Sequence, residues 1–386
     1  MADLDPLSNM KFGIGSADLG RSPIQLLSDW LVGGTKPSAF DEFGGRSFYT
    51  RSGREAIALA LRYWNIGDGD EVLAPAYNCG SEVGPIIATG ARVVMYRIDS
   101  AGRIDFDDLY RRLSARTKLV CVTHYFGKRS EIGDLAEICA GRNIKLLEDC
   151  ALSLFSADVG RIGDGAIFSL KKSLAASDGG VLILRDAPSG DFLGKVSNRA
   201  MLGSALSPVK KWARSIAWPT RGPKAVEGGH FESGSLIVPD IPASYYFPAG
   251  ARLVSASRLA LGLMGRVNGA EIMDRRRRNF AQLRALIDGA GLQFFWESEV
   301  LEPGLCPLGL PILVDDRAAW CRQLNRAGVP VSEWWAGHHR GLDWADFPEA
   351  ATMKRRLLLL PVHQELASRQ IRRIGLTVRS LAGARL

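Results

Sequence analysis

Two residues of the sequence have side chains that could carry covalent chemistry together. Asp149 follows the apolar segment 144–147, and Lys172 follows a second short apolar segment that ends near Phe168. The carboxyl ends of parallel strands meet at one edge of a sheet, where ligands bind. A lysine there can form a Schiff base with the aldehyde of pyridoxal phosphate, and a carboxylate can keep the pyridine nitrogen of that cofactor protonated. A surface ion pair is the alternative interpretation, because both residue types are common where strands end.

The segment 51–56 predicts a helix start that can also bind an anion. Ser52 and Glu55 have the spacing of a capping box, in which each side chain bonds a backbone amide of the first turn. Gly53 allows a phosphate to approach the free amides of that turn, and the charge of Arg54 could add a contact. Capping and phosphate binding are compatible, so both interpretations stand.

Short apolar segments alternate with segments of helical periodicity in the first half of the chain. The expected strands are 71–74, 92–96, 119–123, 144–147, 166–168 and 181–184, and the expected helices are 53–64, 80–89, 105–115 and 131–141. This alternation is typical of βαβ units, which build a mostly parallel sheet with helices on both faces. The sequence therefore predicts an α/β fold with a mostly parallel central sheet.

The second half of the chain breaks this pattern. Residues 187–250 are rich in proline and glycine and predict a long irregular excursion, helical near 209–216. Beyond it we expect helices at 274–290 and 368–374 and a strand at 310–314. We therefore divide the chain into an N-terminal segment (1–45), a large α/β domain (46–250) and a small C-terminal α+β domain (251–386).

Composition excludes several classes of protein. The chain has 386 residues, 46% hydrophobic and 23% charged, which excludes a disordered chain, a collagen and a small disulfide scaffold. No apolar run is long enough for a membrane helix, and the N-terminus lacks the features of a signal peptide. Six cysteines without CxxC spacing predict reduced thiols in a cytoplasmic protein, with no metal site.

The charge of the chain favours an anionic partner. The formal net charge is +8, which suits an anionic small molecule, and no recognition-helix pattern points to nucleic acid. The densest cationic run, 275–278, consists of four arginines at the start of a predicted helix. Four consecutive positions point around a helix, so we interpret this run as a solvated helix face.

The motifs, taken in order, resemble the DegT/DnrJ/EryC1/StrS family of pyridoxal-phosphate-dependent sugar aminotransferases. The segment 52–57 is similar to the family's SGTxAL turn, 147–151 to IEDAA, 168–174 with 178–180 to the segment around the family's lysine, and 360–366 to LPLHxxL. Each motif is weak alone, but their order and spacing together are specific. The resemblance implies an aspartate-aminotransferase-like (type I) fold, pyridoxal 5'-phosphate as cofactor, and a homodimer.

The resemblance also implies roles for individual residues. Lys172 matches the Schiff-base lysine, with Lys171 as the competing candidate, and Asp149 matches the partner of the ring nitrogen. The other implied cofactor contacts are Gly53, Arg54 and Ser169 for the phosphate and Tyr77 or Cys79 for the ring, and the implied substrate contacts are His124, Arg252 and His363. The sequence departs from the family at Cys79, where an aromatic residue is usual, and at Leu152, where a glutamine is usual. The asparagine that the family supplies from a partner subunit has no clear match.

These implications lead to a functional hypothesis with two alternatives. We expect transfer of an amino group from glutamate or glutamine to a keto group, carried by a nucleotide-linked ketosugar. The first alternative is an enzyme of the same fold and cofactor that acts on a non-sugar substrate. The second is a non-catalytic regulatory or binding protein. The expected partners are the amino donor and the keto-sugar nucleotide, with no nucleic acid and no membrane.

Overall fold

A computed structural model describes residues 38–187 and 240–383, apart from residues 175, 177, 297, 299, 332 and 336. Most of the predicted N-terminal segment and of the predicted excursion, including its helix near 209–216, lies outside the described residues. Among the described residues, no helix is both long enough and apolar enough to cross a membrane. The six cysteines all lie in described segments and are free thiols.

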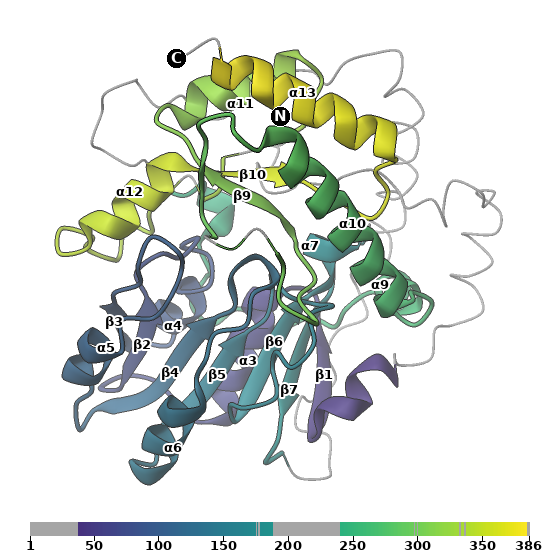
Figure 1. Ribbon diagram of the computed structural model, residues 1–386. Coiled ribbons are helices and arrows are strands. Elements are labelled where there is room, and N and C mark those ends of the chain that lie inside the picture. Colours follow the sequence, from purple (N-terminus) through teal and green to yellow (C-terminus); the bar gives the residue numbers. More distant parts are fainter. Residues whose placement is uncertain are drawn as a thin grey trace.

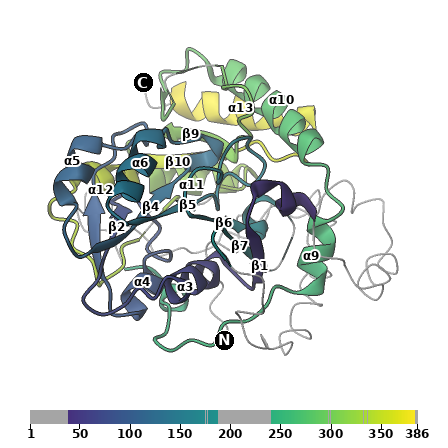
Figure 2. The ribbon, with the colours of Figure 1, turned by 90° about the horizontal axis from the view of Figure 1, so that it is seen from below.

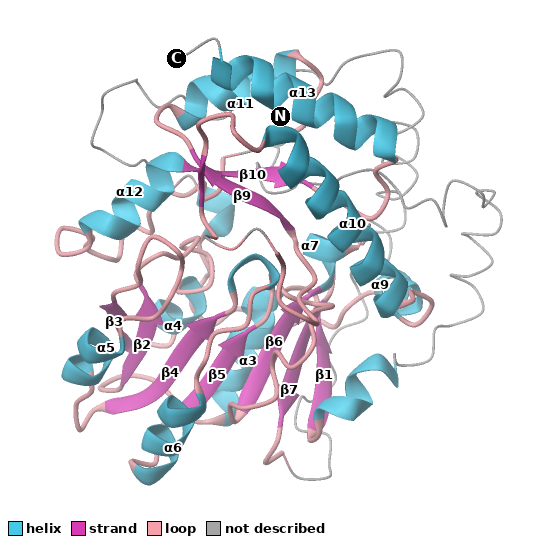
Figure 3. Cartoon of the chain, viewed as in Figure 1, coloured by secondary structure: helices cyan, strands magenta, loops and turns pink. Residues whose placement is uncertain are grey.

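The larger of two sheets has seven strands, which run in the order β1-β7-β6-β5-β4-β2-β3 (Figure 3). Their bounds are β1 Arg46–Thr50, β2 Glu71–Pro75, β3 Arg92–Tyr96, β4 Thr117–Thr123, β5 Lys145–Asp149, β6 Gly165–Ser169 and β7 Gly180–Leu184. The strands β3, β2, β4, β5 and β6 pair in parallel, whereas β7 is antiparallel to both β6 and β1. The predicted α/β fold with a mostly parallel sheet is confirmed.

Helices cover both faces of this sheet because alternate residues of each strand point to opposite sides. The helices are α3 Gly53–Tyr63, α4 Gly84–Ala88, α5 Phe106–Arg112 and α6 Gly133–Gly141, with the single turn α7 Leu170–Ser173 after β6. Leu119 and Leu147 pack with α3 in one apolar cluster, whereas Val120 and Leu146 pack with α6 in another. Seen from below, α3 and α4 lie on one side of the strands and α6 on the other (Figure 2).

A smaller antiparallel sheet lies beyond the carboxyl ends of the parallel strands (Figure 1). Its strands are β8 Gln293–Phe294, β9 Gly309–Leu313 and β10 Leu357–Pro361, and the helices around it are α9 Arg258–Met264, α10 Gly269–Ile287, α11 Arg317–Arg326, α12 Pro348–Arg356 and α13 Ser368–Gly383. One buried apolar cluster joins Tyr77 and Phe126 of the large layer to Phe280 and Trp334 of the small one. The small layer therefore covers the edge at which Asp149 and Lys172 end up.

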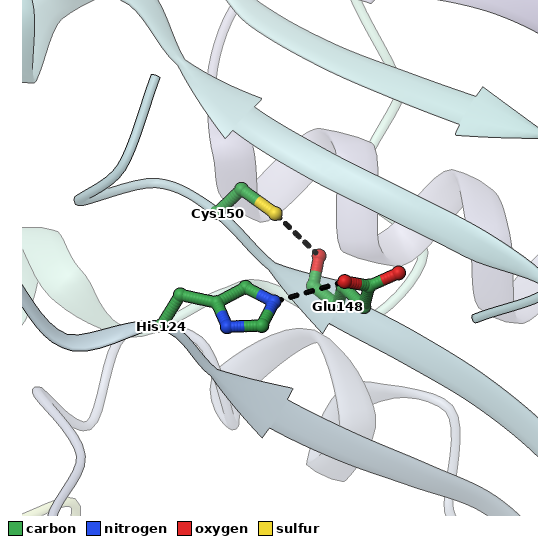
Figure 4. A group of neighbouring side chains, drawn as sticks. All are labelled: His124, Glu148 and Cys150. Carbon is green, nitrogen blue, oxygen red and sulfur yellow. Dashed lines mark hydrogen bonds and ion pairs between the residues drawn. The ribbon is translucent and has the colours of Figure 1, made fainter. Parts of the chain in front are cut away.

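A buried histidine is hydrogen-bonded to a buried glutamate near that edge (Figure 4). His124 follows β4, and its Nε2 lies 2.9 Å from the carboxylate of Glu148 on β5. Its Nδ1 accepts the amide of Ser130 at 3.0 Å, so Nε2 carries the proton and donates to Glu148. Both nitrogens are used and the ring is fully buried. In this structure the side chain holds β4, β5 and the following loop together, and the contact of His124 with substrate stays a prediction.

Glu148 connects this pair to the loop after β5. Its carboxylate accepts amides of Gly160, Ile162 and Gly163 at 2.8, 2.7 and 2.7 Å. Burial raises the pKa of Glu148, but the hydrogen bonds from His124 and from the loop amides outweigh burial and hold the pKa below its usual value. The thiol of Cys150 completes the group, 3.8 Å from the Glu148 carbonyl. Because its carboxylate accepts four hydrogen bonds, Glu148 fixes the strand that carries Asp149.

Replacing Glu148 should destabilise the whole fold. Glu148→Gln retains the shape but removes the charge and turns an amide NH₂ toward donors, so we expect a loss of about 2–4 kcal/mol in the free energy of unfolding. Urea denaturation followed by circular dichroism measures it. Glu137→Gln on the exposed face of α6 is the control and should change stability little. Equal stability of the two variants would contradict the role given to Glu148.

Candidate active site

Lys172 lies in a tight turn at the carboxyl end of β6. The amide of Leu170 bonds the Gly179 carbonyl at 2.9 Å, and the amide of Leu174 closes the single turn of α7 onto the Leu170 carbonyl at 2.8 Å. The Lys172 Nζ lies 5.4 Å from the ring centre of Trp334 and 5.7 Å from that of Trp335. The aromatic faces, which come from the small layer, are favourable surroundings for an ammonium group.

Asp149, the last residue of β5, shares the surroundings of Lys172. Burial, with the charge of Glu82, raises the pKa of its carboxyl from 3.8 to about 6 against the opposing charge of Lys172. One oxygen accepts the Ala151 amide at 2.9 Å, the only hydrogen bond to this carboxylate among the described residues. The structure thus brings Asp149 and Lys172 to one site, as the sequence predicted, and leaves the second carboxylate oxygen for a ligand.

The start of α3 forms a cradle beside Ser169. Ser52 caps the helix by accepting the Glu55 amide at 3.4 Å, and the Glu55 carboxylate accepts the Arg51 amide at 3.1 Å. A Cβ on Gly53 would lie 3.9 Å from the Ser169 Cβ, so the turn and this serine are neighbours. The first two amides of a helix have no intrahelical acceptor, and they can bind an anion together with a hydroxyl.

A glycine on the neighbouring strand makes this cradle possible. A Cβ on Gly180, the first residue of β7, would lie 2.3 Å from the Ser52 carbonyl and 2.7 Å from the Gly53 nitrogen. Backbone atoms cannot yield at such distances, so only glycine fits beneath the turn.

Arg54 contacts a distant segment of the chain. Its guanidinium donates to the carbonyls of Ser244 and Tyr245 at 3.1 and 2.8 Å and lies over the Tyr245 ring. The side chain of Arg54 thus attaches α3 to the turn at Ala243–Tyr245, and the contact of its charge with a phosphate stays a prediction.

Tyr77 and Cys79 follow β2 and occupy different places. Tyr77 is fully buried; its ring packs 4.9 Å from that of Trp335, and its hydroxyl donates to the Trp334 carbonyl at 3.2 Å. Cys79 lies nearer to Lys172, whose charge lowers the thiol pKa. Burial and the charge of Glu82 raise that pKa more strongly, to about 12, so the thiol stays protonated. The thiol donates to the Glu82 carboxylate at 2.5 Å.

The sequence analysis did not predict two charged groups of the site, Glu82 and Lys354. Glu82 lies in the loop after β2, where the strand-end rule could have found it. Lys354 lies on α12 in a run of basic residues that gave no signal. Lys354 is fully buried, and its Nζ donates to the carbonyls of Asn78 and Gly337 at 2.5 and 2.6 Å. Burial lowers the pKa of Lys354 to about 8, against the opposing charge of Glu82.

The two remaining candidates, Arg252 and His363, differ in their surroundings. Arg252 is exposed, and no contact among the described residues joins it to Lys172. His363 is buried against Arg276 and the Ser173 backbone. Burial and the Arg276 charge lower its pKa well below the usual value, so the ring is neutral. His363 thus lies next to the Lys172 turn, and the substrate contacts expected of Arg252 and His363 stay predictions.

The raised pKa of Asp149 predicts a pH-dependent stability. Between about pH 4 and 6 the folded protein holds a proton that the unfolded chain has lost, so stability falls as the pH rises through that window. In the cofactor-free protein, Asp149→Asn should therefore raise the free energy of unfolding by about 1–3 kcal/mol at pH 8 and leave it unchanged near pH 3. Urea titrations at both pH values measure this difference; a variant that is less stable at pH 8 would contradict it.

Comparisons with known proteins agree with the motifs. Residues 38–202 match the model of the DegT/DnrJ/EryC1/StrS aminotransferase family. The chain is 30% identical over 139 residues to the GDP-perosamine synthase of Vibrio cholerae and 31% identical over 155 residues to the dTDP-3-amino-3,6-dideoxy-alpha-D-galactopyranose transaminase of Aneurinibacillus thermoaerophilus. These matches cover 34% and 38% of this chain, and 38% and 43% of the relatives, so the chain spans about two fifths of each relative's length.

The fold is shared over a longer stretch. The aminotransferase TlmJ from Streptoalloteichus hindustanus superimposes with a TM-score of 0.62 at 23% identity, over 100% of this chain and 98% of that one. This likeness confirms the expected type I fold. Over residues 38–202, this chain is therefore similar to the DegT/DnrJ/EryC1/StrS aminotransferase family.

Proposed function

We propose that this protein is a pyridoxal-phosphate-dependent aminotransferase. The observation that carries the proposal is the shared site of Asp149 and Lys172, whose charges act on each other at the edge of the sheet. Next to them lies the cradle of Gly53 and Ser169. An amine, a carboxylate with an unused oxygen and an anion cradle are the three groups that this cofactor needs.

The residues present fit the parts of the cofactor. The amides of Gly53 and Arg54 and the Ser169 hydroxyl would hold the phosphate, Asp149 would pair with the ring nitrogen, and Lys172 would bind the aldehyde. When bound, pyridoxal phosphate supplies an aldehyde that takes up an amino group and a ring that accepts electrons. A carboxyl with a pKa of about 6 is ionised at neutral pH, so Asp149 can hold a proton on the ring nitrogen.

Lys172 is the proton carrier of the proposal. Once its amine is free, it can take a proton from the carbon of the amino donor and return one to the acceptor. The rings of Trp334 and Trp335 lie close to its Nζ and restrict the amine to one region of the site. Cys79 stays a neutral thiol and adds no charge beside the lysine. The burial of Tyr77 and both tryptophans keeps bulk water from this side.

The substrate class comes from relatives and from charge. The matched relatives include the GDP-perosamine synthase and the dTDP-aminosugar transaminase named above, and the +8 charge of this chain suits an anionic partner. We infer that the acceptor is a keto group on a nucleotide-linked sugar and that the donor is glutamate or glutamine. The proposal includes a homodimer in the cytoplasm.

A non-sugar acceptor is the second candidate, and a specific observation favours it. The loop after β2 carries the bonded pair Cys79 and Glu82, where the family usually has an aromatic residue at the position of Cys79. Leu152, at the position of the family's usual glutamine, is buried. A site altered in this way can accept a different substrate.

Removal of the lysine tests the cofactor assignment. Lys172→Ala should lose the visible absorbance of bound pyridoxal phosphate, and amino transfer should fall by about 10²–10⁴-fold, the usual contribution of a general acid–base group. In the unchanged protein, borohydride reduction followed by peptide mass spectrometry should find the cofactor on Lys172. Lys171→Ala is the matched control and should keep absorbance and activity. The reverse pattern would move the assignment to Lys171.

A panel of acceptors tests the substrate class. With glutamate as donor, the enzyme should convert at least one keto-sugar nucleotide much faster than simple keto acids, because the nucleotide adds binding contacts away from the reacting carbon. Coupled detection of 2-oxoglutarate measures the rate. Preference for a keto acid would support the non-sugar alternative. Failure of glutamate and glutamine to change the cofactor spectrum would contradict transamination from these donors.

A further inference from the structure

One arginine of the run at 275–278 is buried. Arg276 is 1% exposed, whereas Arg278 in the same turn of α10 is exposed. The solvated helix face expected for this run is therefore wrong for Arg276. Burial lowers the pKa of its guanidinium, as expected for a cation taken from water without a carboxylate bonded to it. Strong hydrogen bonds must offset the free energy that desolvation of the guanidinium costs.

Arg276 bonds several carbonyl oxygens and the side chain of Cys306. Its Nη2 donates to the Ser173 carbonyl at 3.0 Å, and its Nε donates to the Gln364 side-chain oxygen at 2.8 Å. The amide of Gln364 in turn donates to the same Ser173 carbonyl at 3.3 Å. Arg276 and Gln364 therefore close a buried ring of hydrogen bonds on one peptide unit of the large layer.

That peptide unit directly follows Lys172. A helix of one turn has too few hydrogen bonds of its own to hold its shape, and its last carbonyls lack partners inside the helix. A cation is favourable at this carboxyl end, where the carbonyl dipoles point. Arg276 and Gln364 supply from the small layer the hydrogen bonds that α7 cannot make for itself.

The loop that carries Gln364 is held by the same helix. The side-chain amide of Asn279, one turn beyond Arg276 on α10, donates to the His363 carbonyl at 2.9 Å. Both members of the ring of hydrogen bonds on Ser173 are thus attached to α10. The position of the Lys172 turn is consequently linked to the position of α10.

We propose that Arg276, with Gln364, is a positioning residue for Lys172: it fixes the lysine turn from the small layer and so sets where the amine meets the cofactor. The role toward the cofactor rests on the proposed function, whereas the fixing of the turn does not. Arg276 acts through the backbone of Ser173 and makes no contact with the reacting groups.

Two measurements on Arg276→Ala test this proposal. In the cofactor-free protein, amide hydrogen exchange of the peptide 168–174 should become about tenfold faster, the equivalent of one hydrogen bond from a charged donor. Exchange in strands β2 and β4 should stay the same. The dissociation constant for pyridoxal phosphate, read from visible absorbance, should rise about tenfold for the same reason. Millimolar methylguanidinium should restore both values, which a general loss of packing would not allow.

Matched variants separate the outcomes. Arg278→Ala removes an exposed arginine of the same run and should leave both measurements unchanged. If Arg276→Ala does not fold, Gln364→Met removes the second donor to Ser173 and should shift both measurements in the same direction. Unchanged exchange at 168–174 would overturn the proposal, and so would faster exchange with unchanged cofactor affinity. If the unaltered protein forms no Schiff base at Lys172, the proposed function fails. The amide hydrogen exchange of the peptide 168–174 then tests by itself whether Arg276 fixes the turn.

Discussion

Burial of charge at the carboxyl edge of the large sheet is the constraint on which this site depends. The charge of Glu82 acts there on Asp149 and Lys354, and the charge of Lys172 acts on Asp149. The free energy of an ionised group rises when the group leaves water, unless a partner replaces the solvent. The raised pKa of Asp149 and the lowered pKa of Lys354 show that part of this cost remains. A cationic ring nitrogen bound beside Asp149 would lower the cost, so the structure is suited to such a ligand before it binds.

The small layer makes that burial possible. It covers the edge with Trp334 and Trp335 and contributes to the apolar cluster that it shares with the large layer. It also provides two buried cations, Lys354 and Arg276, and each donates to carbonyls of a large-layer loop that carries a site residue. The two loops after β2 and β6 therefore owe their positions to residues more than 100 positions away in the chain. Catalytic geometry in this architecture is a property of the contact between layers rather than of either layer.

The loop after β2 gives the site its individual character. Where the family usually has an aromatic residue, Cys79 is held by Glu82 through its thiol and its amide. In place of the apolar face of an aromatic ring, the site therefore has a neutral thiol that is hydrogen-bonded to a carboxylate. The carboxylate raises the pKa of Asp149 and stabilises the nearby cation Lys354. The electrostatic balance around the ring site thus differs from that of an aromatic stack, which is the reason to test acceptors beyond sugars.

The sequence by itself determined most of the large sheet and the edge at which Asp149 and Lys172 lie. Apolar periodicity located six of its seven strands, and the rule that ligands bind where parallel strands end selected Asp149 and Lys172, because both signals are local. It missed β1, β8 and β10, which pair with the antiparallel neighbours β7 and β9. It also did not predict the hydrogen-bond partners of Arg54 and His124, and its solvated helix face is wrong for Arg276.

Only the tertiary structure decided those surroundings. Three arginines have different surroundings: Arg54 binds backbone carbonyls, Arg276 is buried and Arg278 is exposed to solvent. The neighbouring residues in the sequence do not predict these differences. Hydrogen-bond partners such as Ser173 for Arg276 lie about 100 residues apart in sequence. Periodicity reports which face of an element is apolar, but the partner of a buried polar group is set by how distant elements pack, because its free energy depends on the acceptors that packing brings within reach.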